Sequence, residues 1–146
     1  MGFVAASAWS RVMTPLKAET LPIQNSSDVV LARQKVRQWA AEIKFSLVDQ
    51  TKLVTAASEL GRNTLDHGRG GHMIIELLED TGRQGIRLVF EDQGPGIADI
   101  QAALKDGFTT GNGMGLGLGG SKRLVNDFHI DSAPGKGTRI AVIRWK

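Results

Sequence analysis

The segment Glu91-Asp-Gln-Gly-Pro-Gly-Ile97 decides the fold that we expect for this chain. Residues 86–91 place apolar side chains at alternate positions, which is typical of a strand with one buried face. Asp92 therefore stands where that strand ends, and Gly94 and Gly96 allow a sharp turn and the close approach of a flat ligand. An ordinary Pro-Gly turn is the alternative, although the full Asp-x-Gly-Pro-Gly run is much less common than Pro-Gly alone.

A second motif, Glu59-Leu-Gly-Arg-Asn63, lies on a predicted helix that begins at the Ser46-Leu-Val-Asp49 cap and runs to about Asp66. Side chains four positions apart share a helix face, so Glu59 and Asn63 lie together, with Asp66 beside them. A solvated polar face is one interpretation. The functional one is a carboxylate that handles a proton next to an amide oxygen, a ligand that suits Mg²⁺.

The glycine-rich stretch Gly111-Asn-Gly-Met-Gly-Leu-Gly-Leu-Gly-Gly120 leads into a predicted helix at 119–126. Exposed backbone amides and a helix start together favour an anion site. The dinucleotide pattern fits only outside its usual strand–turn–helix context, and the P-loop pattern fails at Gly120-Ser-Lys122. Gly135-Lys-Gly-Thr138, taken alone, is a turn before the last strand.

The remaining periodicity predicts a helix from Asn25–Asp28 to about Ile43, an edge strand at 20–24 containing Pro22, and a short helix at 97–104. Further strands are predicted at 72–78, 86–91, 128–132 and 138–145, with a hairpin turn at 80–85. The resulting order, β-α-α-β-β-α-α-β-β, favours an α+β fold, a mixed, mostly antiparallel sheet with helices on one face. We expect residues 1–18 to form an N-terminal arm or edge strand and 19–146 to form a single domain. The glycine clusters fall at the edges of these elements, which suggests loops that meet at one site.

Composition supports an ordinary globular domain and excludes several classes of protein. The chain has 146 residues, of which 41% are hydrophobic and 23% charged, so one core is expected. The net charge of +3 is scattered, which argues against nucleic-acid binding, and no apolar run is long enough for a membrane span. The absence of Cys excludes a disulfide scaffold, a thiolate metal site and a cysteine nucleophile, and fits a cytoplasmic location.

Taken in this order, the four motifs resemble the Bergerat-fold (GHKL) ATP-binding family, over about residues 25–146. The small size and short glycine-rich lid are similar to the anti-sigma-factor branch. Within that branch, Asp106-Gly-Phe-Thr-Thr110 and residues 120–128 most resemble the switch serine/threonine kinases of bacterial stressosomes. The resemblance implies a two-layer α/β sandwich.

The resemblance also implies roles for individual residues. Asp92 would accept a hydrogen bond from the adenine amino group, with Thr138 assisting through water. Asn63 would ligate Mg²⁺, and Glu59 would be the general base that activates the attacking hydroxyl. Glycines would shape the base pocket (Gly94, Gly96) and wrap the phosphates (Gly113, Gly115, Gly117, Gly119).

The function implied by this resemblance is that of an ATP- and Mg²⁺-dependent serine/threonine protein kinase. Its partners would be STAS-domain regulatory proteins in a partner-switching pathway, with a PP2C-type phosphatase or a sigma factor as further candidates. The alternative is a nucleotide-binding module that sequesters a sigma factor or activates a phosphatase with little kinase activity. Glu59 favours the kinase, because a pure binding module does not need a carboxylate four residues before the metal ligand.

Overall fold

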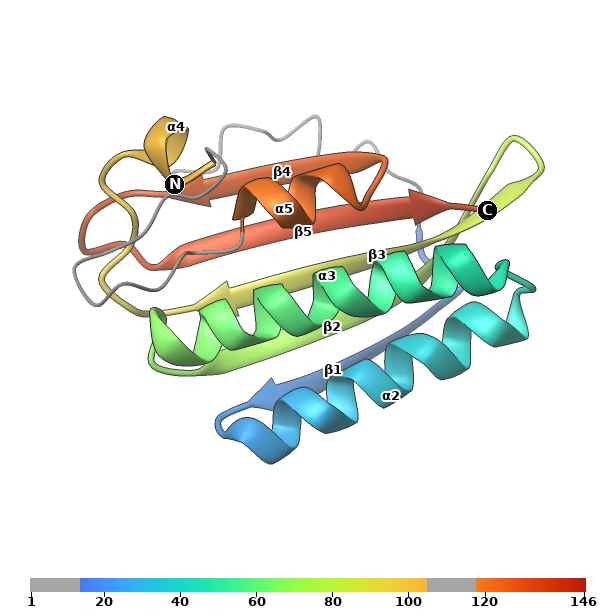
Figure 1. The fold of residues 1–146 in the computed structure, drawn as a ribbon, viewed down its shortest axis with the longest axis horizontal. Coiled ribbons are helices and arrows are strands. Elements are labelled where there is room, and N and C mark those ends of the chain that lie inside the picture. The colour runs from blue at the N-terminus through green and yellow to red at the C-terminus, as the bar shows by residue number, and fades with distance from the viewer. Residues whose placement is uncertain (1–13, 105–117) are drawn as a thin grey trace.

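The computed structural model describes residues 14–104 and 118–146, which form one sheet covered by helices (Figure 1). The observed order of strands and helices matches the predicted order. In chain order the elements are β1 (Lys17–Ile23), α2 (Ser26–Glu42), α3 (Leu47–Asp66), β2 (Gly71–Asp80), β3 (Arg83–Asp92), α4 (Ile100–Ala103), α5 (Leu118–Arg123), β4 (Asp127–Ser132) and β5 (Thr138–Trp145).

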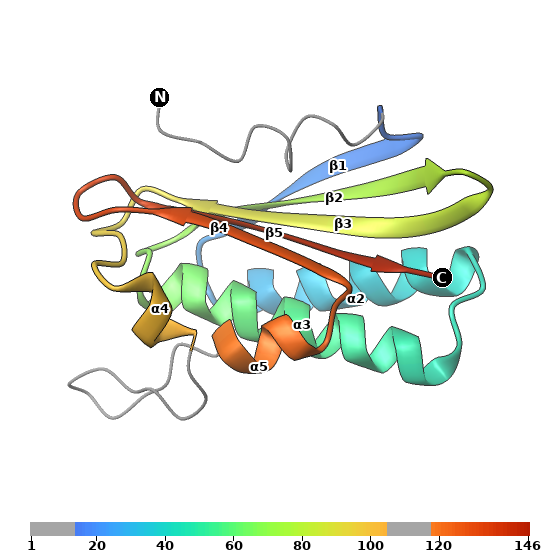
Figure 2. The ribbon, with the colours of Figure 1, turned by 90° about the horizontal axis from the view of Figure 1, so that it is seen from above.

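The described strands form a five-stranded sheet in the order β1-β2-β3-β5-β4. Every pairing among them is antiparallel, so the parallel component that a mixed sheet would need is not found in the described residues. The helices lie on one face of this sheet (Figure 2). β1 is an edge strand, as Pro22 predicts, but it begins at Lys17, three residues earlier than the predicted strand.

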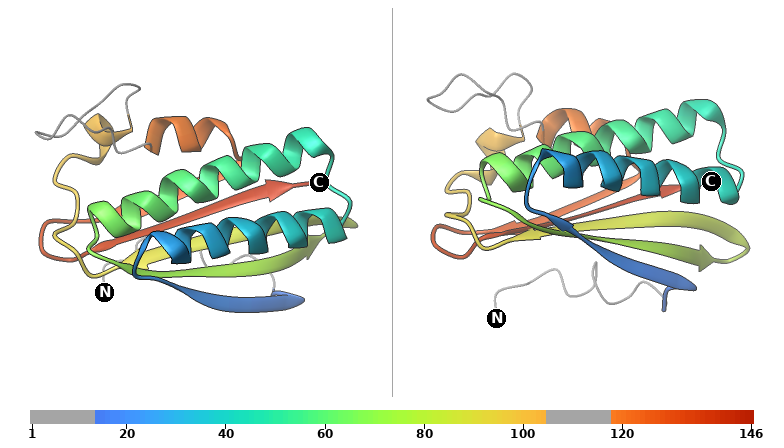
Figure 3. Two further views of the ribbon diagram at one scale, coloured as in Figure 1. Left: turned by 60° about the horizontal axis from the view of Figure 1, so that its bottom comes forward. Right: turned by 90° about the horizontal axis from the view of Figure 1, so that it is seen from below.

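The two long helices begin at the caps that the sequence predicts. The Asn25 side chain accepts a hydrogen bond from the Asp28 amide at 2.9 Å, and the Ser46 hydroxyl accepts one from the Asp49 amide at 3.1 Å. α2 and α3 then lie side by side along the sheet (Figure 3) and pack against each other. Their buried faces contain the predicted apolar stripes (Val29, Ala32, Val36, Trp39 and Ala40 in α2; Leu53, Ala56, Ala57 and Leu60 in α3).

The hairpin between β2 and β3 is tighter than predicted. Its turn consists of Thr81 and Gly82, both with positive φ (49° and 85°), a geometry that suits the twist of a two-residue hairpin. The prediction of a turn over 80–85 was wrong because Gly85 lies inside β3. A Cβ atom there would lie 2.5 Å from the Trp145 ring, so this glycine accommodates a neighbouring strand and does not form a turn.

The two short helices are also shorter than predicted. α4 begins only after Asp99, whose side chain accepts from the Ala102 amide at 3.0 Å. α5 ends at Arg123 because the chain then turns toward β5, where the Asn126 amide donates to the Ile143 carbonyl at 2.9 Å. These changes leave the order of elements intact.

The core lies between the helices and the covered face of the sheet. An ion pair also connects the start of α3 to the sheet. Arg144 of β5 donates a hydrogen bond to the Asp49 carboxylate at 2.6 Å, and this contact lowers the pKa of Asp49. In the part of the chain that the structure describes, no helix has the length and apolarity to cross a membrane.

Candidate functional site

One row of residues crosses the sheet at the end where α3 stops. Gly71 of β2, Asp92 of β3, Thr138 of β5 and Ser132 of β4 are paired in sequence across the four strands. Alternate residues of a strand share a face, and Phe90 and Ile140, two positions along, belong to the core under the helices. Asp92, Thr138 and Ser132 therefore place their polar side chains on the helix-covered face, at its open end.

Asp92 is the buried charge of this row, with 7% of its surface exposed. Its carboxylate accepts a hydrogen bond from the Gly94 amide at 2.9 Å. Burial raises the pKa of Asp92, while the backbone N–H groups of Gly94 and Thr138 and the nearby His67 lower it in part. A buried carboxylate with unfilled acceptor positions is suited to bind a ligand that carries N–H donors.

Glycines from separate loops come into contact around Asp92. A Cβ on Gly68, just after α3, would lie 2.2 Å from the Asp92 carboxyl carbon, and one on Gly94 would lie 2.7 Å from the Gly68 Cα. On the other side, a Cβ on Gly137 would lie 2.2 Å from the Asp92 carbonyl oxygen. Gly96, with a φ of 80°, leaves no room for a Cβ beside the Ala133 carbonyl. The prediction that glycine-bearing loops meet at one site is confirmed for these three clusters.

Thr138 and Ser132 form a hydroxyl pair beside Asp92. Their oxygens are 2.8 Å apart. The Ser132 hydroxyl also donates to the Gly137 carbonyl at 2.8 Å and accepts from the Ile97 amide at 2.8 Å. The end of β4, the turn before β5 and the loop after Gly96 are thus joined at one oxygen atom.

Asn63 lies on the last turns of α3, close to this loop. Its backbone carbonyl accepts from the amides of His67 and Gly68 at 2.9 and 3.2 Å, which connects the helix end to the glycine packed on Asp92. Asn63 is 6% exposed, and within the described residues its side-chain oxygen has no hydrogen-bond partner. An unsatisfied buried oxygen is costly unless a ligand fills it, and an amide oxygen is a suitable ligand for a hard cation. Asn63 therefore fits the Mg²⁺ role that the sequence suggested.

Glu59 lies one turn before Asn63 on α3 and is exposed to solvent. Asp66, predicted to share their face, is also exposed. Asn63 is thus buried, whereas Glu59 and Asp66 are exposed. Their spacing along the helix did not predict this difference in burial.

The predicted phosphate-wrapping glycines are only partly covered by the structure. Gly113, Gly115 and Gly117 lie outside the described residues. Gly119 is buried in α5, which packs against α3, while Lys122 and Arg123 of the same helix are exposed.

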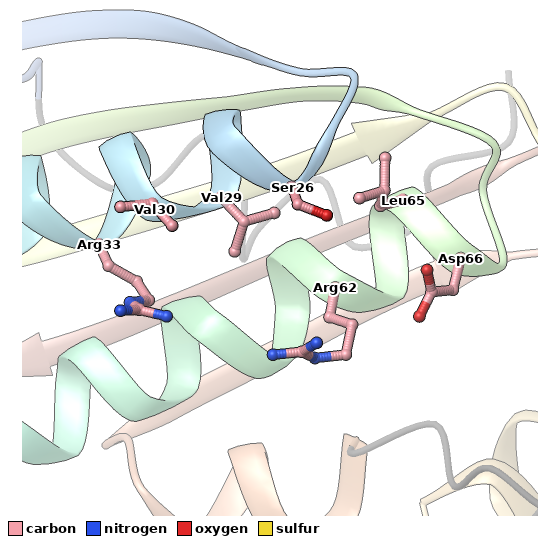
Figure 4. Close-up of a pocket in the computed structure, with 7 residues that line it drawn as sticks. All are labelled: Ser26, Val29, Val30, Arg33, Arg62, Leu65 and Asp66. Atoms are coloured by element: carbon pink, nitrogen blue, oxygen red, sulfur yellow. The ribbon is translucent and has the colours of Figure 1, made fainter.

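A depression of about 160 Å³ lies between the first half of α2 and the end of α3 (Figure 4). Its lining combines apolar groups with the guanidinium groups of Arg33 and Arg62 (Ser26, Val29, Val30, Arg33, Arg62, Leu65 and Asp66). Asp92, Thr138 and Asn63 do not line it, so this depression is separate from the cluster of residues around Asp92.

Sequence reasoning missed the contact of two residues with Asp92 and Thr138. Gly68 was expected only to end the second helix, with Gly70 and Gly71 close behind it, although a glycine directly after a polar helix end is a usable signal for close packing. Ser132 carries no local signal at all, because its role depends on the pairing of β4 with β5.

Comparison with known proteins agrees with this geometry. Residues 48–146 match the family described as histidine kinase-, DNA gyrase B-, and HSP90-like ATPase. The serine/threonine-protein kinase RsbT of Bacillus subtilis (strain 168) is 45% identical over 123 residues, covering 84% of this chain and 92% of RsbT. The anti-sigma F factor of the same organism is 30% identical over 129 residues, covering 83% of this chain and 84% of that protein.

A solved structure shows the same fold. The chain superimposes on a crystal structure of the RsbU and RsbW domains of a Mycobacterium tuberculosis protein with a TM-score of 0.61 and 21% identity. The match covers 92% of this chain and about a third (33%) of the longer one. The predicted α+β fold is thereby confirmed. The similarity to RsbT and to the anti-sigma F factor confirms the resemblance to the anti-sigma-factor branch. The chain belongs to the family of histidine kinase-, DNA gyrase B- and HSP90-like ATPases.

Proposed function

We propose that this protein is an ATP-dependent serine/threonine protein kinase that phosphorylates a STAS-domain partner in a bacterial partner-switching pathway. The observation that carries the proposal is the buried Asp92 beside Thr138, next to a helix bearing an unsatisfied Asn63 oxygen and an exposed Glu59. The 45% identity to a serine/threonine-protein kinase supports the reaction type.

Asp92 binds the adenine base in this proposal. Its carboxylate accepts from the exocyclic amino group, and the Thr138 hydroxyl completes the contact. The glycines let the surrounding loops pack closely against Asp92, because a side chain at Gly68 or Gly94 would overlap the carboxylate or the neighbouring loop.

Asn63 holds Mg²⁺ through its side-chain oxygen. Mg²⁺ held there would neutralise the charge that develops on the phosphates during phosphoryl transfer. The resemblance assigns the binding of the phosphates to the backbone amides of the glycine-rich stretch, including Gly113, Gly115, Gly117 and Gly119.

Glu59 orients the partner hydroxyl and accepts its proton. Its exposure on α3 fits this role, because a protein substrate must reach the base from solvent. The depression between α2 and α3 opens close to the same end of α3 (Figure 4). We place the STAS-domain partner on this side, where its serine or threonine meets the γ-phosphate.

The test is a phosphotransfer assay with radiolabelled ATP and candidate STAS-domain proteins, using wild type and Glu59→Gln. Labelling of a serine or threonine that is lost in Glu59→Gln supports the kinase. The anti-sigma-factor relatives favour a second function, sequestration of a partner, with a PP2C-type phosphatase or a sigma factor as the bound protein. Stable partner binding without any labelling by wild type would establish that function in place of the kinase.

A further inference from the structure

Ser132 is the last residue of β4 and has three hydrogen-bonded neighbours. They are the Gly137 carbonyl, the Ile97 amide and the Thr138 hydroxyl, each 2.8 Å from its oxygen. Gly137 and Thr138 follow each other at the start of β5, and Ile97 lies in the loop after β3.

The directions of these hydrogen bonds follow from counting protons. A serine hydroxyl has one proton and two lone pairs. The Gly137 carbonyl can only accept, so it takes the Ser132 proton, and the Ile97 amide can only donate, so it fills one lone pair. Ser132 has only a lone pair left for its third neighbour. The Thr138 hydroxyl must therefore donate its single proton to Ser132.

This direction determines what Thr138 offers to a ligand. With its proton committed to Ser132, the Thr138 oxygen presents only lone pairs to the pocket. Asp92, its cross-strand partner, presents carboxylate oxygens at the same place. Two acceptors that both face the exocyclic position match an amino group, which has two N–H donors, and repel a carbonyl oxygen placed there.

We propose that Ser132 is a positioning residue that fixes the Thr138 hydroxyl as an acceptor and thereby makes the pocket select a base with an exocyclic amino group. This inference rests on the proposed function, in which Asp92 and Thr138 bind the base. Ser132 itself does not contact the nucleotide. It acts by keeping the Thr138 proton away from the ligand.

The expected effect is on selectivity. Hypoxanthine has a carbonyl oxygen where adenine has its amino group, so inosine triphosphate (ITP) meets two acceptors in the wild-type pocket. In Ser132→Ala the Thr138 proton is released and can turn toward that carbonyl. One hydrogen bond gained by ITP and weakened for ATP should reduce the ATP-to-ITP affinity ratio by about tenfold.

The experiment is calorimetric titration of ATP and ITP into wild type, Ser132→Ala, Ser132→Thr and Thr138→Val. Ser132→Thr keeps a hydroxyl and should retain the wild-type ratio. The double variant Ser132→Ala/Thr138→Val should have the same ratio as Thr138→Val alone, because Ser132 acts only through Thr138. Ser46→Ala is the matched control, since it removes a hydrogen-bonded hydroxyl at the opposite end of α3.

The outcomes separate this inference from the proposed function. A wild-type protein that binds ATP and ITP equally well would overturn the adenine assignment of Asp92, and this inference with it. A wild-type preference for ATP that Ser132→Ala retains, with both affinities falling together, would leave the adenine assignment standing. In that case Ser132 merely holds the loops, and the positioning role is refuted.

Discussion

Replacing Gly68 by alanine tests whether the Asp92 carboxylate is held in a preformed position. The added Cβ would lie 2.2 Å from the carboxyl carbon and 2.4 Å from one of its oxygens. Ordinary carbon contacts lie at about 3.5–4.0 Å, so the carboxyl group or the loop must move by roughly 1 Å or more. Relieving such a clash in a packed site typically costs about 1–3 kcal/mol of unfolding free energy.

The same movement would displace the carboxylate that, in the proposed function, accepts from the amino group of the base. Loss of a hydrogen bond to a charged group corresponds to about 1.5–3 kcal/mol, or a roughly 10- to 100-fold weaker ATP affinity. Calorimetric titration with ATP and thermal unfolding of the free protein measure the two effects separately.

Gly61→Ala is the matched control for Gly68→Ala. Gly61 lies in α3, the helix that Gly68 follows. A Cβ at Gly61 would lie 3.4 Å from the Val29 side chain, which is an ordinary contact. Alanine should therefore stabilise α3 by about 0.5–1 kcal/mol and leave ATP affinity unchanged. Wild-type ATP affinity in Gly68→Ala would refute the idea that this packing positions Asp92 for the base.

Four further predictions concern the polar residues of the site. Because burial raises the pKa of Asp92, the ionised group reduces stability at neutral pH. Asp92→Asn should therefore unfold at a higher temperature than wild type at neutral pH, lose this advantage below the ordinary aspartate pKa of about 3.9, and fail to distinguish ATP from ITP. The raised pKa also means that Asp92 is protonated earlier than an ordinary aspartate as the pH is lowered. The ATP affinity of wild type should therefore begin to fall at a higher pH than it would with an ordinary aspartate, which calorimetry across a pH series measures. Asn63→Ala should weaken ATP binding only in the presence of Mg²⁺, and an equal loss in EDTA would assign Asn63 a structural role instead. Glu59→Gln should reduce phosphorylation of the partner by about 10²–10⁴-fold while ATP affinity and partner pull-down stay at wild-type levels, and labelling at the wild-type rate would exclude Glu59 as the base.

Local signals in the sequence were enough to predict the long helices and most strands. The caps at Asn25 and Ser46 act within four residues, so their geometry can be read from the sequence and is found in the structure. The strand at 138–145 was predicted with its observed bounds, because its apolar pattern is continuous and a glycine turn precedes it. Asp92 was placed correctly at a strand end for the same reason.

The features that were missed depend on contacts between distant segments. Gly85 resembles a turn residue in sequence. Only the pairing of β3 with β5 shows that Gly85 lies opposite Trp145, whose ring leaves no room for a side chain at this position. Ser132 is an ordinary strand serine until its register with Thr138 is known. Glu59 is exposed and Asn63 is buried although they share a helix face, a difference in burial that helix spacing alone does not predict.

The position of β5 has a consequence for how the protein is made. β5 follows the other described strands in the chain, yet it lies between β3 and β4 within the sheet. During synthesis, β3 therefore waits with an unpaired edge until residues 138–145 leave the ribosome. Asp92 and Thr138 come together only at that moment, so a nascent chain that lacks this strand has not yet assembled the residues proposed to bind adenine. Until then, the unpaired edge of β3 exposes backbone groups that can pair with a strand of another chain.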